Sequence, residues 1–310
     1  MIDRPGIYTD MSAADYFADC CPQPSLSRSL AQLMLERSPL HVWHAHPRLN
    51  PHWQRDDDSK YDLAHIAHKQ LIGRGHEIEV LGEEYDSWRT KASQVLRAAA
   101  LARGNLAVLS KHFRIAQAMV RAALEQLELR GLKHLFRDGD GEVVIAWPER
   151  NLPARLPHVA EPAANFWCRQ MLDWLTPDRD MYVDYKTTEA AAAPYLMPRR
   201  LVDNGWDLQA AFAERGLNAV CGEARRRFLF VQQEVESPFC LTVVELSETA
   251  LTMGRKKVNA ALGLWARCLA HDRWPGYPAK IVCPIYPEWA EAQWLEREET
   301  EFDPELLMAG

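Results

Sequence analysis

The sequence changes character near residue 131, and this change most restricts the folds open to the chain. Before it, apolar residues recur at helical spacing, as in Ser27–Arg37, where Leu30, Leu33 and Met34 share one face. After it, short apolar runs between turn residues predict strands. Helices, then strands, then helix, strands and helix predict a central mixed sheet flanked by helices, of class α/β or mixed α+β.

Periodicity and turn residues define the predicted elements. Gly104 and Gly131 mark two helix ends, because glycine readily adopts the left-handed conformation that closes a helix. The predicted helices are Ser27–Arg37, Tyr61–Ile72, Glu83–Arg103, Leu109–Arg130, Leu201–Leu217 and Glu248–Ala270. The predicted strands are Leu132–Arg137, Glu142–Trp147, Phe166–Trp174, Met181–Lys186, Phe228–Gln233 and Cys240–Leu246.

Two segments between strands are rich in turn residues. Asp138–Gly141 reads Asp-Gly-Asp-Gly, which predicts a hairpin that joins the first two strands. Asn151–Pro162 contains three prolines and predicts a loop.

Length and composition bound the architecture and the compartment. A chain of 310 residues is near the upper limit for one domain. We expect a single domain over 1–310, with a mainly helical part (1–130), a catalytic sheet core (131–285) and a C-terminal tail (286–310). No apolar run reaches the roughly 18–20 residues that cross a bilayer, and no signal segment begins the chain. We therefore expect a soluble, cytoplasmic protein with no membrane partner.

Cysteine usage and charge exclude two classes. The seven cysteines form no CxxC pair, which predicts reduced thiols and no iron–sulfur cluster. The net charge of −7 argues against a protein that coats nucleic acid indiscriminately. The clusters Arg199-Arg200, Arg225–Arg227 and Arg255–Lys257 could line a local basic channel or form solvated faces, and the sequence leaves both open.

The segment Met181–Lys186 carries the clearest chemical signal. Asp184 and Lys186 lie two apart on a predicted strand, so their side chains project from the same face. A lone Asp-x-Lys is also typical of an exposed salt bridge. Asp173, near the end of the preceding predicted strand, could converge with Asp184 if the two strands are neighbours. Two close carboxylates repel unless a cation lies between them, and hard oxygen ligands suit Mg²⁺.

Such a metal site with a lysine beside it suits phosphodiester hydrolysis. The metal polarises a phosphate and lowers the pKa of a bound water. Lys186 could orient that water or stabilise the developing charge.

Further segments fall in a specific order along most of the chain. They are Gly6–Ser12, Ser25–Leu30, Pro39–Trp43, Asp62–His68, Glu142–Trp147, Cys168–Asp173, Asp184–Thr188, Gln209–Phe212 and Arg273–Pro275. Together they resemble the RecE-like (exodeoxyribonuclease VIII) branch of the PD-(D/E)xK nuclease superfamily. One departure is Met171-Leu172, which precedes Asp173 where that family usually has Arg-Pro.

The resemblance implies a restriction-endonuclease-like PD-(D/E)xK core with a helical N-terminal half. It implies that Asp173 and Asp184 hold Mg²⁺, which Mn²⁺ could replace, with His68 and Glu142 as further metal ligands. Asp173 and Asp184 are also expected to be catalytic, together with Lys186. Since glutamine can bond both a phosphate and a carboxylate, Gln209 joins the catalytic set.

The resemblance also implies an activity and partners. We expect an exonuclease that acts on double-stranded DNA ends, with 5′→3′ polarity, in phage or prophage recombination. A single-strand annealing protein is the expected partner, and a ring-shaped homo-oligomer is the expected assembly.

Two alternatives stay open. Because Met171-Leu172 alters the setting of Asp173, the chain could be a nuclease-like module that binds DNA ends without cutting them. The second alternative is a zinc hydrolase built on His41, His44, His46 and His52, although this group lacks HExxH spacing and cysteine partners.

Overall fold

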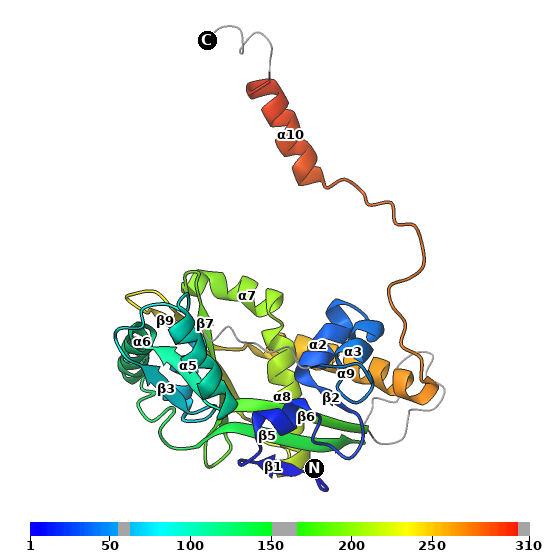
Figure 1. Ribbon diagram of the computed structural model, residues 1–310. Helices are drawn as coiled ribbons and strands as arrows, with labels where there is room; N and C mark the ends of the chain where they lie inside the picture. Colours follow the sequence, from blue (N-terminus) through cyan, green and yellow to red (C-terminus); the bar gives the residue numbers. More distant parts are fainter. Residues whose placement is uncertain (55–62, 151–165, 303–310) are drawn as a thin grey trace. The chain divides into compact units, whose positions relative to one another are not determined.

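The structure is a computed structural model that describes residues 1–54, 63–150 and 166–302. The chain divides into two compact units, Met1–Gly276 and Tyr277–Gly310. The sheet and all the predicted site residues lie in the first unit. The second contains α10 (Glu288–Thr300) (Figure 1). The assignment of residues 1–310 to a single nuclease domain stays a prediction. Among the described residues, no helix is both long enough and apolar enough to span a membrane.

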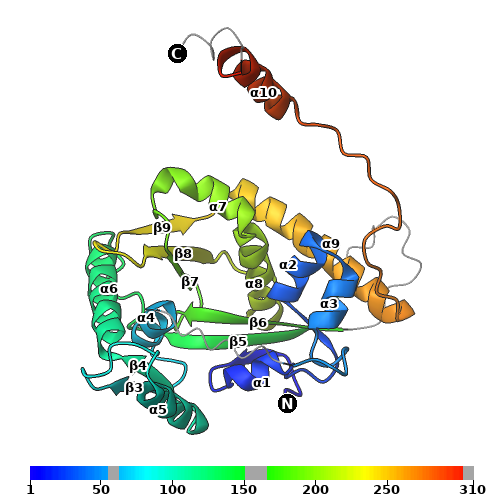
Figure 2. The same cartoon turned by 45° about the horizontal axis from the view of Figure 1, so that its top comes forward.

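A seven-stranded mixed sheet forms the centre of the first unit. Its main path runs β1-β5-β6-β7-β8-β9, and β2 pairs with β6. Figure 2 shows β5 to β9 of this path. β7 and β8 are parallel, as are β2 and β6, whereas the other neighbours are antiparallel. The strands are β1 (Gly6–Tyr8), β2 (Ser25–Ser27), β5 (Asp140–Glu149), β6 (Phe166–Leu175), β7 (Met181–Thr188), β8 (Arg227–Glu234) and β9 (Leu241–Glu245).

Helices cover both faces of this sheet, as predicted. Two apolar cores follow the alternation along β7, because Tyr182 is buried in one core while Val183 and Tyr185 are buried in the other. The first core contains residues of α2 (Arg28–Glu36), α3 (Pro39–Ala45), α8 (Trp206–Cys221) and α9 (Glu248–His271). The second contains residues of α4 (Leu63–Ile72) and α6 (Ser110–Glu128). The fold is therefore mixed α+β with a central sheet between helices.

The remaining elements lie outside the central sheet. β3 (Ile78–Leu81) and β4 (Leu106–Leu109) form a separate two-stranded parallel sheet, and α5 (Lys91–Ala102) connects them along the chain. The other helices are α1 (Ala13–Phe17) and α7 (Met197–Asp203).

The hairpin predicted at Asp138–Gly141 is wrong. Leu132–Arg137 forms turns rather than a strand, and β5 begins inside the predicted turn and pairs with β6. The prediction fails because Gly139 does not serve a tight turn. A Cβ at this position would lie 2.5 Å from the Leu175 carbonyl oxygen, so a side chain there would clash with β6. Here glycine permits close approach between two parts of the chain, which composition alone cannot distinguish from a tight turn.

Two predicted helices also change. The helix predicted over Glu83–Arg103 begins only at Lys91, because the Thr90 side chain caps it by accepting a hydrogen bond from the Ser93 amide at 3.2 Å. The helix predicted over Leu201–Leu217 is interrupted at Gly205, whose φ of 63° is left-handed, so α7 ends and α8 begins around it. The loop predicted at Asn151–Pro162 lies outside the described residues.

A buried ion pair joins the N-terminal segment to β6. Arg169 is only 3% exposed, and its Nη1 donates to Asp19 Oδ1 at 2.9 Å. The Ser25 hydroxyl donates to the same oxygen at 2.6 Å, and the Ser25 amide donates to Asp19 Oδ2 at 3.0 Å. Because Ser25 begins β2, this network fixes β2 beside β6 and so sets where α2 starts.

Candidate active site

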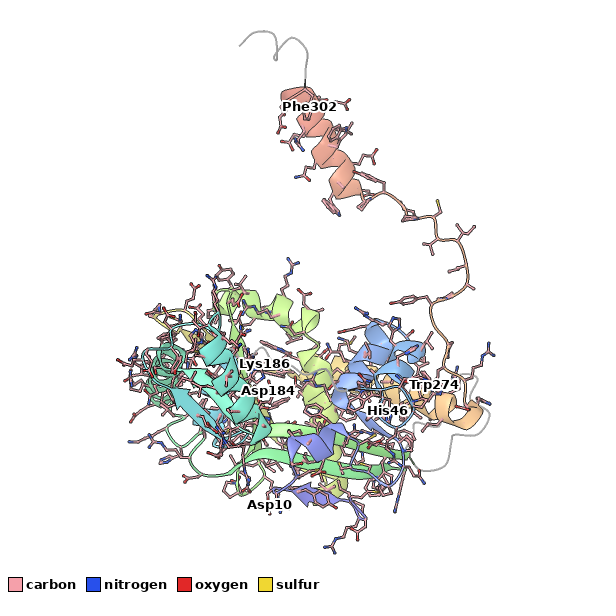
Figure 3. All side chains as sticks on the ribbon, viewed as in Figure 1. Asp10, His46, Asp184, Lys186, Trp274 and Phe302 are labelled. Atoms are coloured by element: carbon pink, nitrogen blue, oxygen red, sulfur yellow. The ribbon has the colours of Figure 1, made fainter. Side chains whose placement is uncertain are left out.

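Asp184 and Lys186 project from β7 toward the α8 side of the sheet. Asp184 is 8% exposed, and the Lys186 ammonium lies 2.6 Å from its Oδ2 as an ion pair. The Lys186 ammonium also lies 5.8 Å from the centroid of the Phe230 ring, on the neighbouring strand β8. Figure 3 shows Asp184 and Lys186 close together. The same-face geometry predicted for this pair is therefore present.

Asp173 lies where β6 and β7 separate. These strands pair only at Trp174–Val183 and Leu175–Tyr182, although one further step of this register would set Asp173 opposite Asp184. Instead of continuing the ladder, Asp173 Oδ2 accepts a hydrogen bond from the Tyr185 amide at 2.8 Å. The strands thus diverge at the residue predicted to be the first metal ligand, and its side chain replaces a backbone bond.

His68 comes from α4 and faces Asp173. Its Nε2 lies 3.6 Å from Asp173 Oδ1, too long for a good hydrogen bond but within ion-pair range. Burial disfavours the imidazolium, but the carboxylates of Asp173, Glu142 and Asp184 outweigh this effect and raise the pKa of His68. His65, which lies on the same helix, keeps the structural interpretation.

Glu142 lies near the same group. Its register position on β5 is opposite Asp173, between the pairs Gly141–Trp174 and Val143–Leu172, yet the ladder skips that position. Glu142 has a left-handed φ of 49° and is half-buried. Its charge contributes to the raised pKa of His68, so it belongs to the same electrostatic group.

Gln209 joins the site from α8. It is 3% exposed, and its Nε2 donates a hydrogen bond to Asp184 Oδ1. The Gln170 amide on β6 donates to the Gln209 carbonyl at 3.5 Å. Helix α8 itself is held close to α9, since a Cβ on Gly254 would lie 2.0 Å from the Asp207 carbonyl oxygen.

The two aspartates have opposite electrostatic settings. Burial and the charge of Asp173 raise the pKa of Asp184, although Lys186 opposes this. Burial also acts to raise the pKa of Asp173, but His68, Lys186 and the Tyr185 amide together bring it below its usual value. Two carboxylates that interact in this way indicate negative charge concentrated in one place, which a cation would relieve.

The donor set fits a divalent cation. Two carboxylates and an imidazole are suitable ligands, and hard oxygen donors favour Mg²⁺ or Mn²⁺. Gln209 Oε1 is a buried acceptor that receives no hydrogen bond from the described residues, while Asp184 Oδ2 is held by the Lys186 ammonium. No three His, Cys, Asp or Glu side chains in the described ranges gather as a ready-made cage. Metal binding would therefore replace the ion pairs that now occupy both aspartates.

The N-terminal histidines lie elsewhere. His46 is fully buried; its Nε2 lies 3.2 Å from the Ser25 carbonyl and 3.4 Å from Asp19 Oδ2, and its Nδ1 accepts from the Arg48 amide at 3.1 Å. Figure 3 shows His46 among the N-terminal helices, apart from Asp184. Both ring nitrogens already have partners, which favours a structural role over the zinc-hydrolase alternative.

This buried histidine has a testable consequence for stability. Burial lowers the pKa of His46 to about 4, although the Asp19 carboxylate opposes it. Between pH 6.5 and 4 the unfolded state binds this proton and the folded state does not, so stability falls as pH falls through this window. Relative to His46→Gln, the wild type should lose about 2 kcal/mol of unfolding free energy between pH 7 and pH 5 in urea titrations. A pH-independent difference would contradict the assignment.

Each of the three basic clusters contains an arginine that forms an ion pair. Arg199 pairs with Asp203, Arg227 with Glu245, and Arg255 with Glu214 and Glu248. These pairs favour the interpretation as solvated faces.

The net charge is unevenly divided between the two units. The second unit has eight acidic and two basic residues, a net charge of −6, which leaves −1 for the first unit. The unit that holds the site is therefore nearly neutral.

One cation near the site was not predicted as a site residue. Arg28 begins α2 immediately after the cap residue Ser27, and its charge acts on the pKa of Asp184. Arg28 lies in the segment Ser25–Leu30, which is part of the family resemblance. Nothing in the sequence of that segment indicates that Arg28 lies near β7.

Comparisons with known proteins agree with this geometry. Residues 97–284 match a family described as "PDDEXK-like domain of unknown function (DUF3799)". The fold is similar to a crystal structure described as a "Putative exonuclease" from Eubacterium rectale, with a TM-score of 0.54 and 10% identity over 91% of this chain and 98% of that chain. A crystal structure of SSO0001 matches with a TM-score of 0.25 and 10% identity over 63% of this chain and 84% of that chain. No curated protein matches the sequence. The PD-(D/E)xK core is thereby confirmed, while the RecE-like branch stays a prediction.

Proposed function

We propose that this chain, which belongs to the family of PDDEXK-like domains of unknown function (DUF3799), is a metal-dependent deoxyribonuclease. The observation that carries the proposal is the convergence of Asp184, Lys186 and Gln209 beside Asp173, where two strands of the sheet separate. This group combines carboxylates for a divalent cation with an ammonium and an amide that could contact a phosphate.

Each residue has a chemical role in this proposal. Asp173 and Asp184 would hold Mg²⁺ or Mn²⁺, with His68 and Glu142 assisting, and the bound cation supplies Lewis-acid polarisation and an acidified water. The Lys186 ammonium stabilises negative charge on the phosphate and orients the attacking water. Gln209 holds Asp184 in place through its Nε2 and leaves its Oε1 available as an acceptor.

The finer proposal is an exonuclease of duplex DNA ends with 5′→3′ polarity. It is supported by the resemblance to RecE-like enzymes, and the structurally similar protein from Eubacterium rectale is described as a "Putative exonuclease". From the same resemblance we propose a role in phage-type recombination, a cytoplasmic location, a single-strand annealing protein as partner and a ring-shaped homo-oligomer.

A plasmid assay tests both levels of the proposal. Linear, nicked and covalently closed forms of one plasmid are incubated with Mg²⁺ or Mn²⁺, and acid-soluble nucleotide release is followed. We expect rapid release from the linear form and none from the closed form. Equal cutting of closed and linear forms would refute the exonuclease and leave the nuclease standing.

A non-cutting DNA-binding module is the second candidate. The observation in its favour is that Lys186 and His68 already occupy the two aspartates as ion pairs. Binding of linear duplex without nucleotide release, with either metal, would establish this function instead.

A further inference from the structure

Arg28 is a cation beside the site that forms no ion pair within the described residues. Its Nη1 donates to Gln32 Oε1 at 3.0 Å, while its Nε and Nη2 have no hydrogen-bond partner among those residues. Arg28 as a whole residue is half-buried. Two other cations in this part of the first unit already form ion pairs: Lys186 pairs with Asp184, and Arg169 pairs with Asp19.

The fold places Arg28 next to the catalytic residues. β2 pairs in parallel with β6 at Leu26–Cys168 and Ser27–Arg169, so one more step along both strands brings Arg28 level with Gln170. The Gln170 amide bonds the carbonyl of Gln209, whose side chain bonds Asp184. In Figure 2, α2 lies beside α8 and α9, against which it packs.

The guanidinium is also held in position. Gln32 accepts from Arg28, and its own Nε2 donates to Glu36 Oε1 at 2.6 Å and to the Asn204 carbonyl at 3.4 Å. Asn204 directly precedes Gly205, the cap residue of α8. Arg28 is therefore tied to the turn that starts the helix carrying Gln209, which restricts its movement relative to Asp184.

We propose that Arg28 binds a backbone phosphate of the DNA strand that enters the site, through the paired donors Nε and Nη2. This inference rests on the proposed deoxyribonuclease function. The planar guanidinium presents two parallel N–H donors that match two phosphate oxygens. A strand that enters beside the carboxylates of Asp173, Asp184 and Glu142 is repelled by them, and the charge of Arg28 would reduce this repulsion together with that of Lys186.

Charge-matched variants test the proposal. Arg28→Gln removes the charge, and Arg28→Lys keeps it without the paired donors. Exposed Arg37, just after the end of α2, provides the control Arg37→Gln, which has the same net charge as Arg28→Gln. Affinity for a linear duplex is measured by fluorescence anisotropy from 50 to 200 mM salt, with Ca²⁺ in place of Mg²⁺, and kcat and KM are measured with Mg²⁺.

We expect Arg28→Gln to weaken duplex binding by about 10- to 100-fold. The slope of log K against log salt should become shallower by about 0.9, the effect of one lost phosphate contact. Arg28→Lys should recover the slope but only part of the affinity, and Arg37→Gln should match the wild type. A structural role for Arg28 would instead lower thermal stability without changing the salt slope.

The outcomes separate the two proposals. If the wild type binds and cuts DNA and Arg28→Gln has an unchanged affinity and salt slope, the assignment of Arg28 is wrong and the nuclease stands. If the wild type neither binds nor cuts DNA, the nuclease proposal fails and the assignment of Arg28 fails with it.

Discussion

Replacing Asp184 with asparagine is expected to lower the rate of DNA cleavage by about 10³-fold or more while the protein stays folded. The variant loses the charge that would hold the metal and that pairs with Lys186. It keeps an oxygen able to accept from Gln209 Nε2. Because burial and the charge of Asp173 raise the pKa of Asp184, the ionised carboxylate is not favoured by its surroundings. Its removal should therefore change the unfolding free energy by no more than about 1 kcal/mol.

The measurements are the initial rate of nucleotide release from linear duplex and the thermal unfolding midpoint of the same preparation. Asp203→Asn is the matched control, since Asp203 is exposed and, among the described residues, forms an ion pair with Arg199. Lys186→Ala distinguishes a role in the chemical step from a role in metal binding. It should lower kcat, while the Mg²⁺ concentration for half-maximal rate stays the same or falls. Normal cleavage by a folded Asp184→Asn protein would place the site elsewhere.

Arg169→Met is expected to destabilise the protein by about 3–5 kcal/mol, a large part of the stability of an ordinary domain. The variant fills a similar volume but leaves the buried Asp19 carboxylate with only the more distant Arg48 cation, whose Nη1 lies 3.9 Å from Asp19 Oδ2. It also removes the bond from Arg169 Nε to the Tyr16 carbonyl, 3.1 Å long. Because the same network holds β2 against β6, DNA cleavage should fall along with stability.

Urea unfolding with fluorescence detection measures this loss. The control Arg227→Met breaks an ion pair with Glu245 that is about half exposed, and it should cost no more than about 1 kcal/mol. The double variant Arg169→Met/Asp19→Asn should be more stable than Arg169→Met alone, because it removes the buried negative charge. Asparagine tolerates the left-handed φ of 67° at this position and keeps an oxygen that can accept from Ser25. Equal decreases in the free energy of unfolding for Arg169→Met and Arg227→Met would show that the buried ion pair contributes no more to stability than the exposed one.

Local patterns predicted the parts of the site that lie on one strand. Asp184 and Lys186 share a face because alternation along β7 depends only on sequence spacing. Gln209 and His68 could be proposed only through a family resemblance, since α8 and α4 reach the sheet by tertiary packing. The bond from the Tyr185 amide to Asp173 depends on where β6 and β7 separate, and no spacing along the chain determines that point.

The errors have the same origin. The sequence pattern predicts a turn at Gly139, whereas this glycine permits a close approach to Leu175, a contact between distant parts of the chain. Arg28 was overlooked because its nearness to Asp184 arises from the pairing of β2 with β6. Such contacts depend on which segments become neighbours in space, and composition and periodicity do not encode that choice directly.

The separation of β6 from β7 has a mechanical consequence. Paired positions join β6 to β5 from Asp140–Leu175 to Glu149–Phe166, and β7 to β8 along all of β7, but only two pairs join β6 to β7. The sheet is therefore well paired on both sides of a short seam, with one aspartate on each side of it. A small rotation about this seam would change the spacing of the two carboxylates without breaking the pairing on either side. If the two aspartates hold a cation as proposed, the spacing of its ligands would depend on this seam more than on any other part of the sheet.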